Sequence, residues 1–141
     1  MTDIIRSLGS TAIIAVGPGR RIPIVRSTTH PNARWKFPGG HVEEYDRSIA
    51  DSVKRELLEE TGLRLSGKAH YLSSALRVDH SIYIYYGEVA SWDDLGKGVR
   101  EEEVFLATAR EIFSISDFSR GHQRILNEAI QKLERRGIRL L

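Results

Sequence analysis

Three glutamates, Glu56, Glu59 and Glu60, stand close enough together in the chain to act as a group. At about 100° per residue they fall on one side of a helix. Like charges at this spacing destabilise an isolated helix by roughly a few tenths of a kcal/mol, so helix stability does not account for them. A hard divalent cation bound by oxygen ligands would turn that repulsion into attraction. For the three glutamates alone, a solvated acidic helix face is the alternative explanation.

A glycine-rich turn precedes the glutamates. Two aromatic residues, Trp35 and Phe37, lead into Pro38-Gly39-Gly40. The aromatic residues predict a short packed strand, and the glycines allow backbone angles that other residues avoid. Gly39 and Gly40 would also let the main chain approach another group closely. A plain turn is the alternative when this segment is considered by itself.

A helix is expected to position the glutamates. It should begin near Asp46 to Ser48, which are good N-cap residue types, and Gly62 is a natural residue to end it. Apolar residues recur along it at helical spacing, namely Ile49, Ala50, Val53 and Leu57. The helix would bury this apolar side and present the glutamates on another, opposite whatever the glycine turn approaches.

The remaining pattern predicts strands at residues 11–16, 22–25, 69–76, 81–89 and 102–108. The first two are expected to form a hairpin, with Pro23 at an edge or a strand start. Residues 81–89 are so continuously apolar that we place them in the middle of a sheet. A long closing helix should run from Asp117 or Ser119 to Arg136 and stop at Gly137. This order predicts an α/β or α+β fold, with helices on both faces of a mixed sheet.

The composition fits one globular domain. The chain has 141 residues, 40% hydrophobic and 28% charged, and we treat residues 1–141 as a single domain. No apolar run approaches the roughly 18 to 20 residues of a membrane span. The net charge of +2 argues against a nucleic-acid partner. The absence of cysteine excludes thiol chemistry, and residues 1–6 lack a secretory signal, so a cytoplasmic protein is expected.

The segment from Gly40 to Leu63 resembles the box of the Nudix (MutT-like) hydrolases, usually written G-x5-E-x7-R-E-U-x-E-E-x-G-U with U aliphatic. Its second half, Arg55-Glu56-Leu57-Leu58-Glu59-Glu60-Thr61-Gly62-Leu63, matches at every defined position. The preceding Trp-Lys-Phe-Pro-Gly-Gly at 35–40 also resembles the usual lead-in of the family. The resemblance implies a Nudix-like α/β/α sandwich with a mixed β-sheet between helices, and a single Nudix hydrolase domain whose box covers about 40–63.

The sequence departs from this pattern at one place. Counting six residues on from Gly40 gives Asp46 instead of glutamate, and eight residues rather than seven separate it from Arg55. Counting back from Arg55 without a gap places Arg47 where the acid should stand. We prefer the first alignment, because Asp46 retains a carboxylate and the turn into the helix can absorb one extra residue.

The resemblance implies a metal-dependent hydrolase that cleaves the diphosphate linkage of a nucleoside diphosphate joined to another group. The ions would be Mg²⁺ or Mn²⁺, and cations on the phosphate oxygens lower the barrier to attack by water. By resemblance, Glu59 and Glu60 bind metal together with the main-chain carbonyl of Gly39. Glu56 either shares this metal cluster or accepts the proton of the attacking water. Arg55 would orient a glutamate through charge-assisted hydrogen bonds.

Residues outside the box can complete such a site. Family members often add an acid from the loop before a late strand, where Glu101, Glu102 and Glu103 stand in this chain. The sequence does not say which of these three, if any, points inward, and a solvated loop residue is the alternative explanation for each; Glu102 is our candidate. Arg26 and Lys36 flank the expected cleft and could neutralise phosphates.

The expected partner is a small molecule, a nucleoside diphosphate derivative. The loops at 27–34 and 91–98 should select its second group, and neither carries a signature for a particular one. Many relatives dimerise, so a homodimer is compatible with the resemblance. The alternative of a different class is a non-catalytic Nudix-fold domain that binds a nucleotide and regulates something; the intact acids of the box argue against it.

Overall fold

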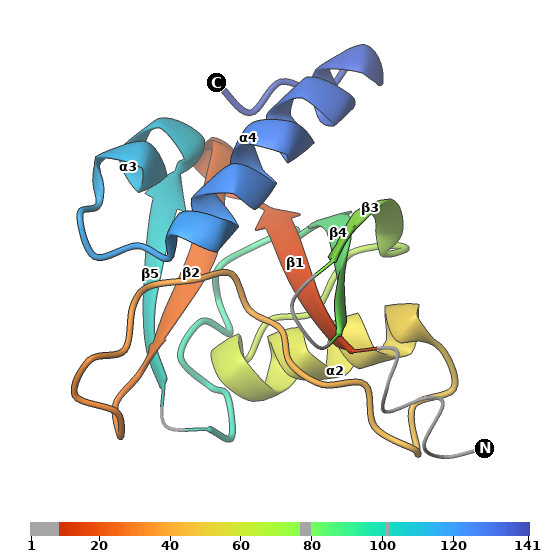
Figure 1. Cartoon of the computed structure of the whole chain (residues 1–141), viewed down its shortest axis with the longest axis vertical. Coiled ribbons are helices and arrows are strands. Elements are labelled where there is room, and N and C mark those ends of the chain that lie inside the picture. Colours follow the sequence, from red (N-terminus) through yellow and green to blue (C-terminus); the bar gives the residue numbers. More distant parts are fainter. Residues whose placement is uncertain (1–8, 77–79, 101) are drawn as a thin grey trace.

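The computed structural model describes residues 9–76, 80–100 and 102–141, arranged as Figure 1 shows. Residues 1–6 and Glu101, considered above, lie outside the described residues. In chain order the described elements are β1 (Ser10–Val16), the 3-10 turn η1 (Pro18–Arg20), β2 (Arg21–Ser27), α2 (Ile49–Thr61), β3 (His70–Leu76), β4 (Ser81–Glu88), β5 (Glu102–Thr108), α3 (Ala109–Ser114) and α4 (Arg120–Arg135). None of the helices described is long and apolar enough to cross a membrane.

Three strands form a mixed sheet in the order β1, β4, β3. β1 runs parallel to β4, with Ile13 opposite Tyr85, and β3 runs antiparallel to β4. β4 therefore has a neighbour on both sides, which confirms the mid-sheet position expected for residues 81–89. A strand that is paired on both edges and covered on both faces buries its side chains on both sides of the sheet. This explains why the apolar run in β4 is continuous.

The other two strands, β2 and β5, pair antiparallel in a sheet of their own. The hairpin expected between residues 11–16 and 22–25 is wrong, because β1 and β2 belong to different sheets. The edge of β1 that β2 would have needed is occupied by the glycine turn: the Thr11 amide donates to the Gly40 carbonyl at 2.8 Å. Pro23 lies within β2.

A linking segment, residues 35–41, connects the two sheets. On one side the main chains of Lys36 and Val25 in β2 exchange hydrogen bonds of 2.8 and 3.0 Å. On the other side the amide of Ile13 in β1 donates to the Pro38 carbonyl at 2.9 Å. The short strand expected here is thus reduced to isolated bridges, and the segment lies between β2 and β1.

Helices cover both faces of the strands, α2 on one side and α4 on the other (Figure 1). β1 alternates between them: Ala12 and Ile14 are buried in the core that α4 covers, and Ile13 and Ala15 in the core that α2 covers. α4 contributes Ile125, Leu126, Ala129 and Leu133 to the first core, and α2 contributes Val53 and Leu57 to the second. The mixed α+β architecture with a mixed sheet between helices confirms the expected fold class.

The helix that carries the glutamates begins and ends where the sequence predicts. The Ser48 hydroxyl accepts a hydrogen bond from the Asp51 amide at 3.0 Å and so caps its first turn. At the other end Gly62 adopts a left-handed φ of 83°, and its amide donates to the Leu58 carbonyl at 2.9 Å. Both ends of α2 are therefore fixed by local chemistry.

The closing helix α4 is capped by Ser119 and is followed by Gly137 with φ of 82°, close to the expected limits. The short helix α3 was not expected. Thr108 and Glu111 form a capping box at its start. Six residues are too few to show helical periodicity, so this cap was the available signal.

Candidate active site

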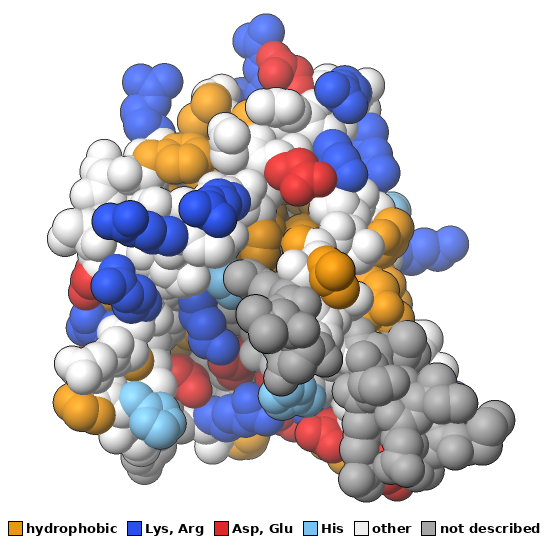
Figure 2. Space-filling view, in the orientation of Figure 1, with side chains coloured by type: hydrophobic (Ala, Val, Ile, Leu, Met, Phe, Trp, Pro, Cys, Tyr) orange, Lys and Arg blue, Asp and Glu red, His pale blue; other side chains and the backbone are white. Residues whose placement is uncertain are grey.

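A cavity of about 430 Å³ opens between the glycine turn, α2 and the segment that enters β5. Figure 2 shows acidic side chains recessed in a hollow of this face, with basic side chains around it. The sequence-predicted residues on its wall are Lys36, Gly39, Glu56, Glu60 and Glu102. Segments far apart in the chain thus meet at the place where the box predicted a site.

The glycine turn leaves no room for side chains. A Cβ on Gly39 would collide with the carbonyl oxygen of Thr11 in β1. A Cβ on Gly40 would lie 2.7 Å from Oε1 of Glu56, closer than real Cβ contacts come. The two glycines therefore let the main chain pack between β1 and the acids of α2, which is the close approach that the sequence indicated.

Glu60 is held against this turn. Its side chain is buried, and its Oε1 accepts a hydrogen bond from the Gly39 amide at 2.8 Å. Burial raises the pKa of Glu60 to about 7, and the nearby charges of Glu56 and Glu102 act in the same direction. The Gly39 amide and the positive charge of Lys36 partly oppose this rise in pKa. A carboxylate so poorly solvated would be stabilised by a bound cation.

This burial predicts a pH-dependent stability difference between the metal-free protein and Glu60→Gln. The pKa of Glu60 rises from 4.5 to about 7 on folding, so between these values the folded state binds more protons than the unfolded state. The contribution of Glu60 to the free energy of unfolding therefore falls as the pH rises through this range. Melting temperatures should be measured with a chelator from pH 4.5 to 8. The melting temperature of Glu60→Gln should rise relative to that of the parent as the pH increases to about 7. A difference in melting temperature that does not change with pH would contradict the raised pKa of Glu60.

Asp46 meets Arg55 despite the extra residue between them. The arginine donates from Nε to Oδ1 of Asp46 at 2.9 Å and from Nη2 to Oδ2 at 3.0 Å. The Asp46 side chain is 3% exposed. Burial acts to raise the pKa of Asp46, but the hydrogen bonds from Arg55 and from the Glu43 amide, together with the charge of Arg55, outweigh this and lower it. Arg47, which the other alignment would place here, is exposed.

Two arginines hold the remaining glutamates. Nη1 of Arg55 donates to Glu56 at 3.1 Å and to Glu59 at 3.1 Å. Arg100 donates to the same two carboxylates, at 2.9 Å in each case. Glu56 is buried between these cations. The sequence predicted that Arg55 would contact a glutamate, but it gave no prediction for Arg100. The available signal was a single cation directly before the acidic run 101–103.

The residues expected outside the box are placed differently from one another. Glu102 lines the cavity, whereas Glu103 pairs with Arg26 at 3.0 Å outside it. Arg26 also pairs with Asp117 at 2.9 Å and does not line this cavity. Lys36 does line it, as expected for a residue that meets phosphate. Glu101 lies outside the described residues.

The cavity also contains a histidine that sequence spacing did not connect with the box. His122, in the first turn of α4, accepts a hydrogen bond from the Phe37 amide at 3.1 Å through Nδ1. Its ring stacks on Phe37 with the centroids 5.7 Å apart. His122 therefore supports the linking segment from behind, and only the fold brings it there.

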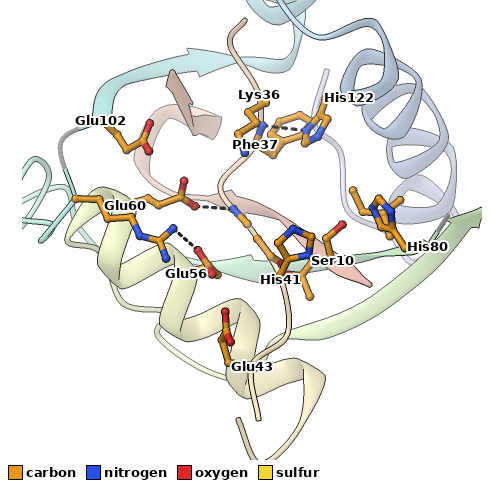
Figure 3. A pocket seen from close by; sticks show the side chains of 15 residues that line it. Ser10, Lys36, Phe37, His41, Glu43, Glu56, Glu60, His80, Glu102 and His122 are labelled. Atoms are coloured by element: carbon orange, nitrogen blue, oxygen red, sulfur yellow. Dashed lines mark hydrogen bonds and ion pairs between the residues drawn. The ribbon is translucent and has the colours of Figure 1, made fainter. Parts of the chain in front are cut away.

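The donor chemistry of the cavity fits a hard divalent ion. Among the described residues no three His, Asp or Glu side chains already converge on one point. The carboxyl groups of Glu56, Glu60 and Glu102 nevertheless lie around one opening, with Lys36 at its rim (Figure 3). Oε2 of Glu102 is buried and, among the described residues, has no hydrogen-bond partner. A buried carboxylate oxygen without a donor is a group that a cation would satisfy.

Comparison with known proteins matches most of the chain to one family. The family model described as the NUDIX domain matches residues 7–133. No curated protein sequence matches the chain significantly.

Several solved structures share the fold. A MutT structure from work on Aliivibrio salmonicida and Vibrio cholerae superposes with a TM-score of 0.68 at 19% identity, covering 87% of this chain and 96% of that one. MutT from Methanosarcina mazei Go1 gives 0.65 at 18%, covering 89% and 93%. A NUDIX-family hydrolase from Clostridium perfringens gives 0.69 at 13%, covering 85% and 93%.

Proposed function

Because the chain belongs to the Nudix hydrolase family, we propose that it cleaves the diphosphate linkage of a nucleoside diphosphate joined to another group, by attack of water on phosphorus. Family membership supports a pyrophosphohydrolase-type enzyme. One observation supports the finer proposal. The buried Glu56 and Glu60 line one cavity beside the glycine turn together with Glu102, whose buried Oε2 has no hydrogen-bond partner within the described part of the chain. Carboxylates in such an arrangement repel each other unless a cation joins them.

The proposed cofactor is Mg²⁺ or Mn²⁺, held by Glu56, Glu59 and Glu60 with the main-chain carbonyl of Gly39. Glu102 is a further candidate ligand, since it shares the cavity with Glu60. When bound, the ion would neutralise the diphosphate and favour attack by water. Glu59 does not line the cavity, and its carboxylate, which is 24% exposed, pairs with the two arginines. To bind the metal ion, the Glu59 side chain would have to move away from these arginines.

The chain's own residues divide the remaining tasks. Glu56 is proposed as a metal ligand or as the acceptor of the water proton. Arg55 is proposed as a positioning residue, because it donates to Glu56 while Asp46 fixes its guanidinium from behind. Lys36 is proposed to neutralise phosphate oxygens at the rim of the cavity. Arg26 is the less supported candidate for phosphate binding, because it pairs with Glu103 and Asp117 outside the cavity.

The second group of the substrate is proposed to lie against the loop at 27–34. A second cavity, of about 640 Å³, is lined by residues of this loop and shares Lys36 with the first. A diphosphate at Lys36 could thus extend into either space. The proposal also includes a cytoplasmic location and a small-molecule partner, and it is compatible with a homodimer.

A nucleotide panel with Mg²⁺ or Mn²⁺ tests this function. The panel should contain nucleoside triphosphates, ADP-ribose, dinucleoside polyphosphates and nucleotide sugars. At least one is expected to release a nucleoside monophosphate, and a chelator should abolish the release, because the acids alone would repel the diphosphate. Metal-dependent binding without turnover across the panel would favour the nucleotide-binding regulatory domain instead.

A further inference from the structure

Glu56 and Glu59 are clamped between two cations that are built very differently. Arg55 is 17% exposed, and its bidentate contact with Asp46 gives it a partner outside the pair of glutamates. Arg100 is 44% exposed, and among the described residues its ion pairs are made to Glu56 and Glu59 alone. Arg55 therefore belongs to the framework of the site. The guanidinium of Arg100, by contrast, is held within the described part of the chain by the two carboxylates alone.

The main chain beneath Arg100 is firmly attached to α2. Its amide donates to the Glu59 carbonyl at 3.0 Å. A Cβ on Gly98 would lie 2.5 Å from that same carbonyl oxygen, so the loop rests directly on the helix. If the guanidinium left the carboxylates, the backbone would keep it at the wall of the cavity, which Arg100 already lines.

Arg100 occupies carboxylate oxygens that the proposed metal ion would need. Oε2 of Glu56 accepts from Arg100 at 2.9 Å, drawn as the dashed line at Glu56 in Figure 3. Oε2 of Glu59 also accepts from Arg100 at 2.9 Å. A hard divalent ion would need carboxylate oxygens from the same glutamates. A cation and a guanidinium repel each other, so both cannot occupy one carboxylate face. An arginine released beside such an ion would find a strong acceptor in a diphosphate.

We propose that Arg100 is an internal counter-cation that neutralises Glu56 and Glu59 in the metal-free protein, is displaced by the divalent ion, and then binds the diphosphate. This inference rests on the proposed metal-dependent hydrolysis and adds an exchange of partners to it. Two binding events follow with opposite signs: Arg100 opposes the binding of the ion and favours the binding of the diphosphate. A residue that merely shaped the site would affect both in the same direction.

Calorimetric titration of Mn²⁺ alone into Arg100→Gln and the parent tests the first half. The variant should bind Mn²⁺ at least roughly fivefold more tightly, the lower end of typical coupling between linked binding events. It should also melt at a lower temperature without metal, and saturating Mn²⁺ should remove that difference. Lys97→Gln is the matched control, since it removes the same charge from the same loop where Lys97 pairs with the exposed Asp94. Its Mn²⁺ affinity should equal that of the parent.

Titration of imidodiphosphate, a diphosphate analogue, at saturating Mg²⁺ tests the second half. Arg100→Gln should bind it roughly tenfold more weakly, because a charge-assisted hydrogen bond is lost. Arg100→Lys, which retains a charge but cannot bridge both carboxylates, should lie between parent and Arg100→Gln in both titrations. This variant also guards against a folding defect in the glutamine variant.

The possible outcomes distinguish failure of the Arg100 exchange from failure of the proposed hydrolase function. Tighter Mn²⁺ binding with weaker imidodiphosphate binding supports the exchange. A parent that binds Mn²⁺ while Arg100→Gln binds it equally or more weakly overturns the exchange and leaves the hydrolase proposal standing. Unchanged imidodiphosphate affinity overturns the substrate-binding half. A parent that binds no Mn²⁺ removes the hydrolase proposal and the exchange together.

Discussion

Glu60→Gln is expected to lower kcat/KM by roughly 10³-fold on the best substrate of the panel, with the fold intact. Removing one charged metal ligand should cost several kcal/mol of transition-state stabilisation, and about 4 kcal/mol corresponds to that factor. The glutamine retains an oxygen that can accept the Gly39 amide, now 2.8 Å from Glu60, so the turn should keep its place. Steady-state kinetics, with circular dichroism as the check on folding, measure both effects.

Asp51→Asn is the matched control for this variant. It removes the same charge from the same helix, but Asp51 is exposed in the first turn of α2 and far along the helix from the cavity. Its activity should equal that of the parent, and its stability should fall only slightly, by about 0.3 to 1 kcal/mol from the loss of an acid near a helix N-terminus. Parental turnover by Glu60→Gln would rule out Glu60 as a metal ligand.

Arg55→Met should produce the largest loss of stability among the site variants. The change removes the arginine that pairs with Asp46 and one of the two arginines that pair with Glu56. The side chains of Asp46 and Glu56 are each 3% exposed. Breaking a buried ion pair from one side leaves an uncompensated buried charge, at a cost of about 3 to 5 kcal/mol. Urea denaturation of the metal-free protein measures this free energy of unfolding.

Lys54→Met supplies the comparison, because it removes a positive charge from the adjacent, exposed position of α2. It should change the free energy of unfolding by no more than about 0.5 kcal/mol. Asp46→Asn combined with Arg55→Met should be strongly non-additive, since the two side chains form one bidentate contact. Equal losses for Lys54→Met and Arg55→Met would show that the buried pair contributes nothing specific.

The sequence predicted the acidic helix well because local chemistry determines it. Ser48 and Gly62 set its ends, and the spacing of the acids set the side from which they project. The glycine turn was equally legible, since Gly39 and Gly40 are required by contacts that a Cβ would prevent. The preferred alignment put Asp46 at the acid position of the box despite the inserted residue, and in the structure Asp46 contacts Arg55.

What the sequence could not show depends on contacts between distant segments. The expected hairpin failed because Pro38 and Gly40 occupy the edge of β1, and nothing local to residues 11–25 indicates that competition. Arg100 reaches Glu56 across 44 positions, and His122 reaches Phe37 across 85. In the sequence alone, Arg100 and His122 look the same as ordinary surface residues, so these contacts could not be predicted.

The linking segment at 35–41 has a consequence for how the molecule opens. It joins β2 to β1 by main-chain hydrogen bonds, and the same few residues carry the amide that holds Glu60. Separation of the two sheets would break the glycine turn at the same moment. Local unfolding of this segment would remove the Gly39 amide from Glu60 and the hydrogen bonds through which the segment joins β1 to β2 in one cooperative step. A partly assembled site would therefore not form, and loss of the site would indicate loss of the fold in this region.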